Sequence, residues 1–271
     1  MQKILFLFSI IFLAFFSPGL AQEKTLGNKQ IEQEEPGLRQ GDVLLIPFDE
    51  RMYNSEFDRG LAEKEGLEFA QIRSIFRKAI DTSLYMNVLV DHSVITLLRW
   101  HNPDVAKDIN KVWASVSFNY EDIEVEKPGA KGILKAKQKP QKAATSGPVK
   151  VSSGQLSKGQ EDKEKHMAVV ANNTEAFQEM YEKYGSIYFI FINQVDIKRA
   201  KGTSYISMEQ NDFQKEARLH YTILNLKGER VASGVSVGSF HSGYSKLQDY
   251  IDKGIKPAAA KIAEQLPKTE Q

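Results

Sequence analysis

Apolar runs alternate with helical repeats in the first half of the chain. Residues 43–46 are four consecutive aliphatic residues followed by proline, which predicts a strand buried on both faces. From residue 68 apolar side chains recur every three or four positions, so we expect an amphipathic helix laid on a sheet. A second helix should begin at residue 103 and carry its apolar face to Val116. Residues 87–98 contain two short apolar runs, each of which fits either a strand or a helical turn.

The second half of the chain gives clearer signals. A helix should follow Asn173, a good N-cap residue, and end at Gly185. Residues 187–192 combine aromatic and β-branched side chains, which predicts the strongest and most central strand. Residues 199–214 are polar and should form a loop. Residues 51–65 are charged, and we expect a loop or a short irregular helix there.

Two alternating segments near the C-terminus predict a β-hairpin. Residues 217–225 place apolar side chains on one face, and residues 231–237 follow the same alternation. Gly228 lies between them and can adopt the positive φ that a tight turn needs. A final helix should begin at residue 245, and Pro257 should kink or split it.

Together these elements predict an α/β (α+β) fold. We expect a single mixed-sheet domain over residues 41–266, with helices packed mainly on one face and a C-terminal β-hairpin and helix. Residues 22–40 are rich in Gln and Glu and should form a flexible leader. Residues 267–271 should form a short tail.

The first 21 residues have the layout of a secretory signal peptide. Lys3 precedes an apolar run, residues 4–16, and small residues then precede a cut before Gln22. The run is shorter than the roughly 20 apolar residues that a membrane span needs. We therefore expect an exported bacterial protein, periplasmic or extracellular, with no transmembrane segment once the signal is removed.

The absence of cysteine removes several classes of protein. A disulfide scaffold, a thiolate metal site, a cysteine nucleophile and a lipid-anchored bacterial lipoprotein all need this residue. Export without cysteine favours a bacterial envelope over a eukaryotic secretory route.

A basic segment interrupts the middle of the chain. Residues 127–160 contain eight lysines and no acidic residue, although the whole chain has a net charge of only +1. We expect a disordered surface insertion at about residues 127–166. It is either a solubilising loop or a binder of anionic polymer or membrane surface. The segment lacks the aromatic side chains that stack on single-stranded nucleic acid. The lysines proposed for anionic-surface binding are Lys131, Lys135, Lys137, Lys139 and Lys142.

Three segments resemble parts of a small α/β domain found in envelope proteins. Residues 43–48 read VLLIPF, residues 188–193 form a strong strand after a helix, and residues 221–231 form the hairpin. This arrangement resembles the domain shared by the TolB N-terminal region, the curli secretion protein CsgG and the lipoprotein LpoB. In that group a V-L-P-F strand and a D-x-x-T-G-E hairpin recur, and residues 225–229 are a loose counterpart of the latter.

The resemblance covers roughly residues 41–120 and 170–266. It implies a non-enzymatic envelope accessory that acts through contacts with proteins or cell-wall polymer. The chain departs from the group because it lacks a lipidation cysteine and carries the basic insertion. Because the lipidation cysteine is missing, the resemblance does not extend to membrane anchoring or to a CsgG-like pore.

No residue pattern predicts a catalytic set, a metal site or a cofactor. The five histidines do not show the spacing of a zinc protease. Residues 234–238 match G-x-S-x-G, but the alternation continues through Ser236, which places this serine in a strand rather than in a nucleophile elbow. We expect His220 on the solvent side of its strand.

The loop after the first strand is the main candidate for a binding site. Loops beyond strand ends are favoured binding places in α/β sheets. Its apolar residues, Met52, Tyr53 and Phe57, either anchor a partner or fold back over the core. In the alternative, the protein is an exported hydrolase that uses a pair of carboxylates from Asp49, Glu50, Glu56 and Asp58. The proposed binding residues are Asp49, Glu50, Arg51, Met52, Tyr53 and Phe57.

The preferred hypothesis is an exported, non-enzymatic periplasmic accessory or adaptor. Its expected partner is an envelope protein or a cell-wall polymer, and not nucleic acid. The hydrolase and the lysine-rich binder of anionic surfaces are the alternatives. The sequence leaves the oligomeric state open.

Overall fold

The computed structural model describes residues 41–98, 103–123 and 164–268. The expected signal peptide and leader, the five lysines of the basic insertion and most of the C-terminal tail lie outside these residues. No helix in the described ranges is both long enough and apolar enough to span a membrane.

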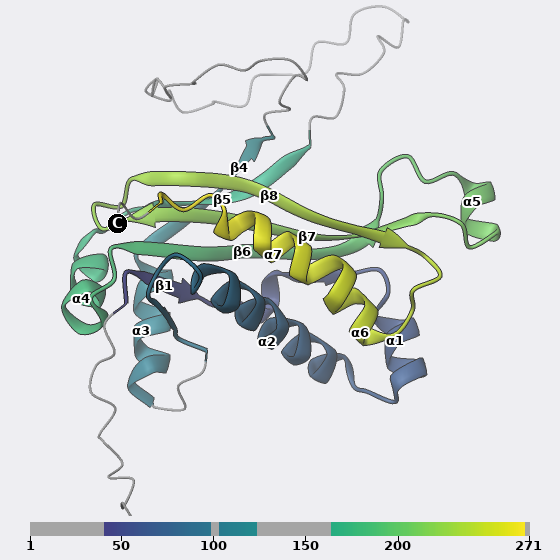
Figure 1. The fold of residues 1–271 in the computed structure, drawn as a ribbon, viewed down its shortest axis with the longest axis horizontal. Helices are drawn as coiled ribbons and strands as arrows, with labels where there is room; N and C mark the ends of the chain where they lie inside the picture. The colour runs from purple at the N-terminus through teal and green to yellow at the C-terminus, as the bar shows by residue number, and fades with distance from the viewer. Residues whose placement is uncertain (1–40, 99–102, 124–163, 269–271) are drawn as a thin grey trace, which may run out of the picture. The chain divides into compact units, whose positions relative to one another are not determined.

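The predicted α/β fold is confirmed, and its centre is a mixed sheet (Figure 1). The strands are β1 (Val43–Ile46), β2 (Tyr53–Ser55), β3 (Val94–Thr96), β6 (Tyr188–Arg199), β7 (Gln214–Asn225) and β8 (Arg230–His241). Their order is β3-β1-β6-β7-β8, and β2 pairs with β6 beyond the end of β1. β1 runs parallel to β3 and β6, whereas β6, β7 and β8 are antiparallel neighbours. The strand predicted at residues 187–192 is central as expected, and it extends to Arg199.

A helical layer covers one face of this sheet. Its members are α1 (Asp58–Glu65), α2 (Phe69–Val88), α6 (Leu247–Asp249), the π-helix η2 (Tyr250–Ile255) and α7 (Lys256–Ala263). Apolar side chains from these helices and from alternate strand positions form one buried cluster. The disturbance predicted at Pro257 takes the form of the π-helical turn that precedes it.

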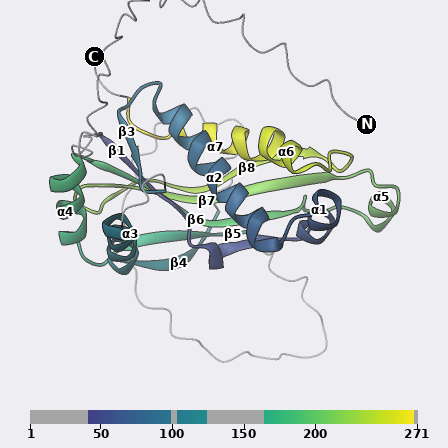
Figure 2. The same ribbon diagram turned by 90° about the horizontal axis from the view of Figure 1, so that it is seen from below.

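The opposite face carries a second layer that the sequence did not predict in full. It consists of α3 (Pro103–Ala114), β4 (Val116–Asp122), β5 (Lys165–Ala171) and α4 (Glu175–Tyr184). Figure 2 shows α2 and α7 on one side of the main sheet and α3 with β4 on the other. A separate apolar cluster fills this side.

The β4–β5 pair corrects the sequence prediction at two places. Val116 was expected on the face of a helix, but it begins β4 and pairs with Ala171. β5 begins at Lys165, inside the last residues of the expected insertion. The two strands pair across the gap in the described residues, and Ile123 N–H donates to the Glu164 carbonyl at 2.8 Å. Local periodicity cannot reveal a pairing between segments so distant in sequence.

The ambiguous segments also acquire definite structures. Residues 87 and 88 are the last residues of α2, and residues 94–96 form β3. The charged stretch after β1 contains the short 3₁₀ helix η1 (Glu50–Met52), β2 and α1. The polar stretch after β6 contains the short helix α5 (Tyr205–Glu209).

Candidate functional site

A cleft opens beside β2, where β6 continues past the end of β1. Its volume is about 890 Å³, within the usual range for ligand sites of about 300–1,000 Å³. It is lined by residues 53–56, by Asp58 and Arg59 of α1, by Phe69 and Arg73 of α2, and by residues 196–198 of β6. This set defines the β2 cleft.

A bulge in β6 sets the direction of its cleft residues. The register between β6 and β7 shifts between Ile192 and Gln194. Because of this shift Val195 and Ile197 remain in the helix-side core together with Ile192. Side chains alternate along a strand, so Asp196 points to the opposite face.

Three side chains hold the Asp196 carboxylate. Asn54 Nδ2 and Gln194 Nε2 donate to Oδ1 at 3.1 and 2.8 Å, and His220 Nε2 lies 3.1 Å from Oδ2. Burial raises the pKa of Asp196, but these hydrogen bonds outweigh burial and lower the pKa to about 2. The carboxylate is therefore ionised near neutral pH and is a poor proton acceptor.

The position of His220 corrects the sequence prediction. Its side chain points away from the face that Leu219 and Tyr221 share, but β5 covers that side and the residue is only 3% exposed. The Met167 backbone N–H donates to His220 Nδ1 at 3.0 Å, which assigns the ring proton to Nε2 and directs it at Asp196. The histidine is thus a buried structural partner of a cleft carboxylate.

Two of the four acidic residues considered for catalysis line the β2 cleft. Glu56 Oε2 lies 2.7 Å from Arg199 Nε. Asp58 Oδ1 accepts a hydrogen bond from the Tyr53 hydroxyl at 2.6 Å. Burial, assisted by this bond, raises the pKa of Tyr53, so the hydroxyl stays a donor. Both carboxylates therefore have partners inside the chain.

Three cationic side chains also line the β2 cleft, and they are not paired as the carboxylates are. Arg59 is exposed, and Arg73 and Lys198 are half-buried. Within the described residues these side chains have no hydrogen-bond or ion-pair partner, and Arg73 Nε is buried without one. The charge of Lys198 does act on Glu164: burial raises the pKa of that carboxyl, but Arg218 and, more weakly, Lys198 lower it. The cleft thus offers two uncommitted guanidinium donors, Arg59 and Arg73, beside committed carboxylates. Such a set suits an anionic group, because guanidinium and ammonium groups bind carboxylates and phosphates through charge-assisted hydrogen bonds.

The predicted binding residues at the start of the loop lie outside the cleft lining. Asp49 accepts hydrogen bonds from the Arg51 backbone N–H at 2.9 Å and from its Nη2 at 2.5 Å, which caps η1. The Arg51 side chain thereby lowers the pKa of Asp49. Glu50 Oε1 lies 3.4 Å from Arg77 Nη1. Met52 is half-buried.

The two aromatic members of the predicted set pack inward. The Tyr53 ring lies 6.0 Å from that of Phe76, and the Phe57 ring lies 6.1 Å from that of Tyr250. Of the two arrangements that the sequence left open, the structure shows these rings folded over the core. The hydroxyl of Tyr53 still reaches the cleft through Asp58.

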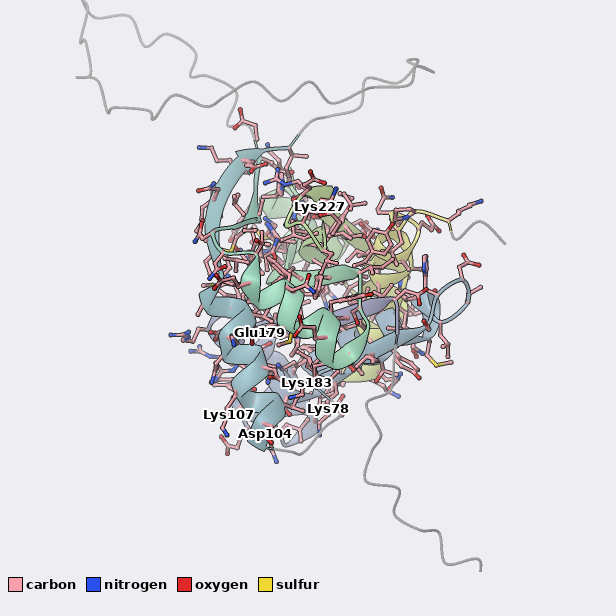
Figure 3. The ribbon with its side chains drawn as sticks, turned by 90° about the vertical axis from the view of Figure 1, so that its left-hand side faces the viewer. Lys78, Asp104, Lys107, Glu179, Lys183 and Lys227 are labelled. Atoms are coloured by element: carbon pink, nitrogen blue, oxygen red, sulfur yellow. The ribbon has the colours of Figure 1, made fainter. Side chains whose placement is uncertain are left out.

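The α3–α4 end of the molecule carries ion pairs that stabilise the second layer. Lys183 Nζ lies 2.5 Å from Asp108 Oδ2, and Lys111 pairs with Glu179 across the two helices. Figure 3 shows Glu179 and Lys183 along α4, with Asp104 and Lys107 on the neighbouring α3. These charges are matched within the layer. In the described part of the chain, no group of three or more His, Asp or Glu residues is arranged to hold a metal ion.

Sequence reasoning missed the cleft residues that come from distant elements. Arg73 belongs to the polar side of α2, and Asp196 and Lys198 alternate with apolar residues at the end of β6. The one available signal was that polar alternation, which marks a strand end with a solvated face. It does not reveal that β2 and α2 meet β6 there.

Comparison with known proteins adds no relative. The chain matches no protein-family model. No curated protein matches it, and no solved structure does.

Proposed function

We propose that the protein is an exported, non-enzymatic accessory or adaptor that binds another component of the bacterial cell envelope. The observation that carries this proposal is the β2 cleft, whose cationic side chains lack internal partners while its carboxylates have them. The group recognised is therefore anionic, as in an acidic protein segment or an acidic wall polymer. The expected signal peptide and the resemblance to envelope domains support the compartment.

Arg59 and Arg73 are the side chains expected to hold the anionic group. Both line the cleft from different helices, so they can contact one ligand from two directions. Binding through exposed charges weakens as salt screens them. A ligand held by this cleft should therefore dissociate more readily at high ionic strength.

Cross-linking in intact cells followed by affinity capture tests the proposal. The unaltered protein should recover a defined envelope component, and the double variant R59Q/R73Q should lose it. R51Q is the matched control, because the Arg51 side chain is 86% exposed and pairs with Asp49 outside the cleft. Equal recovery by both variants, or recovery of no defined component, would contradict the proposal.

A second candidate function is an exported hydrolase. It is favoured by the presence of Glu56 and Asp58 in one cleft, with His220 behind Asp196. If this function holds, hydrolysis of ester, peptide or glycoside substrates should fall in E56Q and in D58N but not in D49N. Activity that is insensitive to both cleft variants would remove the candidate.

The third candidate is binding of anionic polymer or membrane surface by the lysine-rich segment. Since β4 and β5 pair on either side of the gap, deletion of residues 127–160 leaves both strands in place. Loss of salt-sensitive binding to anionic vesicles or wall fragments in this deletion would support the candidate. Unchanged binding would reject it.

A further inference from the structure

β8 presents a long unpaired edge. It is the last strand of the main sheet, and no strand of the described residues pairs with its outer side. Its 12 residues extend over about 40 Å at the usual rise of a strand. The opposite edge of the sheet, β3, has only three residues.

This edge has few of the features that normally prevent strands from pairing. Edge strands are usually protected by charged side chains, proline or a covering element. Between Arg230 and His241 the strand contains no charged residue and no proline. Val231, Ala232, Val235 and Val237 are half-buried. Protection comes from Lys261, whose Nζ donates to the Val237 carbonyl at 2.7 Å.

The sequence of the edge is symmetric. Residues 233–239 read S-G-V-S-V-G-S, which is the same in both directions about Ser236. Suppose that two copies of this strand pair antiparallel about a twofold axis at Ser236. Val235 of each copy then lies opposite Val237 of the other. Gly234 likewise meets Gly238, so every central pair joins residues of the same kind and size.

We propose that two copies of this chain associate through β8, antiparallel and with the twofold axis at Ser236. A twofold interface uses the same patch on both subunits, and it closes after one contact. The pairing satisfies the outer backbone groups of both strands and covers the half-buried valines. Lys261 competes with this association, because its ammonium group must leave or share the Val237 carbonyl.

α7 and the π-helical turn before it pack on one face of β8. Gly238 closely approaches the backbone of Gly254 there, and the buried Ser236 hydroxyl donates to the Ala258 carbonyl of α7 at 2.7 Å. A second copy must therefore approach β8 beside α7, where the Lys261 side chain reaches the outer edge. β6 and β7 separate β8 from β2, so the association does not use the β2 cleft and does not depend on the function proposed above.

Cysteine cross-linking locates the axis. The chain contains no cysteine, so V235C introduces a single thiol. Val235 is half-buried and, by alternation, lies on the face of β8 away from the helices. In the proposed dimer the two thiols are only about 7 Å apart along the strands, so a short bis-maleimide reagent should convert V235C to a covalent dimer. S239C is the matched control on the same strand, because the two thiols are then about 20 Å apart along the strands. Equal cross-linking of both variants would overturn the proposed register.

Sedimentation tests the association itself and covers the case in which V235C does not fold. The unaltered protein should sediment at twice the monomer mass, and V235K should raise the dimer dissociation constant by about tenfold or more, because charge on an edge opposes pairing. V90K is the control, since Val90 is 77% exposed and lies outside β8. A protein that stays monomeric over the tested concentrations, or that pairs only with a strand from another protein, would overturn the proposal.

Discussion

Buried polar side chains fasten β5 to the main sheet. The Met167 N–H donates to His220 Nδ1 at 3.0 Å, and the Val169 N–H donates to Thr222 Oγ1 at 3.1 Å. Asn193 Nδ2 donates to the Met167 carbonyl at 2.8 Å. Backbone groups on this side of β5 are thus satisfied by side chains of β6 and β7. Buried polar groups of this kind contribute to stability only while every partner is present.

Asp196 supplies a prediction about charge in this layer. Its pKa of about 2 lies below the ordinary value of 3.8, which corresponds to about 2 kcal/mol of stability at neutral pH. This contribution is fully present when the pH is above 3.8, the ordinary pKa of an aspartate. It is lost as the pH falls from there through the pKa of about 2 in the folded protein. D196N should therefore lower the free energy of unfolding in urea by about 2 kcal/mol at neutral pH, with the difference narrowing in acid.

The control for this measurement is D212N. Asp212 pairs with His241, but its side chain is 76% exposed. Exposed ion pairs contribute little, so this variant should change the free energy of unfolding by less than about 1 kcal/mol. Similar losses of unfolding free energy in D196N and D212N would contradict a specific contribution of the buried Asp196 charge to stability.

His166 gives a prediction with the same dependence on protonation, but at higher pH. Burial lowers the pKa of this histidine below its ordinary value of 6.5, although Glu121 partly opposes the effect. The unfolded chain therefore binds a proton that the folded chain resists. Stability should decrease as the pH falls below the ordinary value toward the lower folded one. H166Q should flatten this part of the profile of unfolding free energy against pH; an unchanged slope would contradict the assignment.

At the level of elements, two glycines determine how the C-terminal helix meets the sheet. A Cβ added to Gly238 would lie 1.9 Å from the Gly254 carbonyl oxygen. A Cβ added to Gly254 would lie 2.8 Å from Phe240 and 2.9 Å from Ala217. The π-helical turn therefore rests on β7 and β8 with no side chain between the backbones.

Alanine substitution tests this contact. G238A should lower the free energy of unfolding by about 1–3 kcal/mol or more, because the helix must move away from the strand. G60A is the control, since nothing lies within 4 Å of a Cβ added there in α1. It should raise stability by about 0.5–1 kcal/mol through helix propensity and reduced freedom of the unfolded chain. Equal effects in thermal or urea unfolding would contradict the close approach.

Elements that depend on local signals were predictable from the sequence, and those that depend on distant pairing were not. The aliphatic run of β1 and the glycine at 228, with φ of 73°, were placed correctly because each signal lies within a few residues. β4 and β5 were missed because their pairing joins segments that are far apart in the sequence. The same limit applies to the site, where His220 was misplaced because its covering strand was unknown. The residues after β1 were proposed as a binding site, and of the six named there only Tyr53 lines the β2 cleft.

For the whole molecule, export is the prediction on which the proposed compartment depends. Cleavage after Ala21 should leave Gln22 as the first residue of the mature protein. Mass spectrometry of protein purified from the envelope fraction should identify this terminus. Intact protein recovered from the cytosol with Met1 attached would contradict export, but it would leave the cleft and the β8 edge unaffected.

The hydrogen bond between Ile123 and Glu164 closes the β4–β5 pair, so the rest of the fold should depend little on the length and sequence of the segment between these two residues. Both ends of that stretch are already held together by β4 and β5, so its closure entropy changes by only about 0.6 kcal/mol for each doubling of length. Insertions and deletions in this part should therefore leave the folding of the rest of the chain unchanged. The same position is where an engineer could graft a reporter or a recognition peptide.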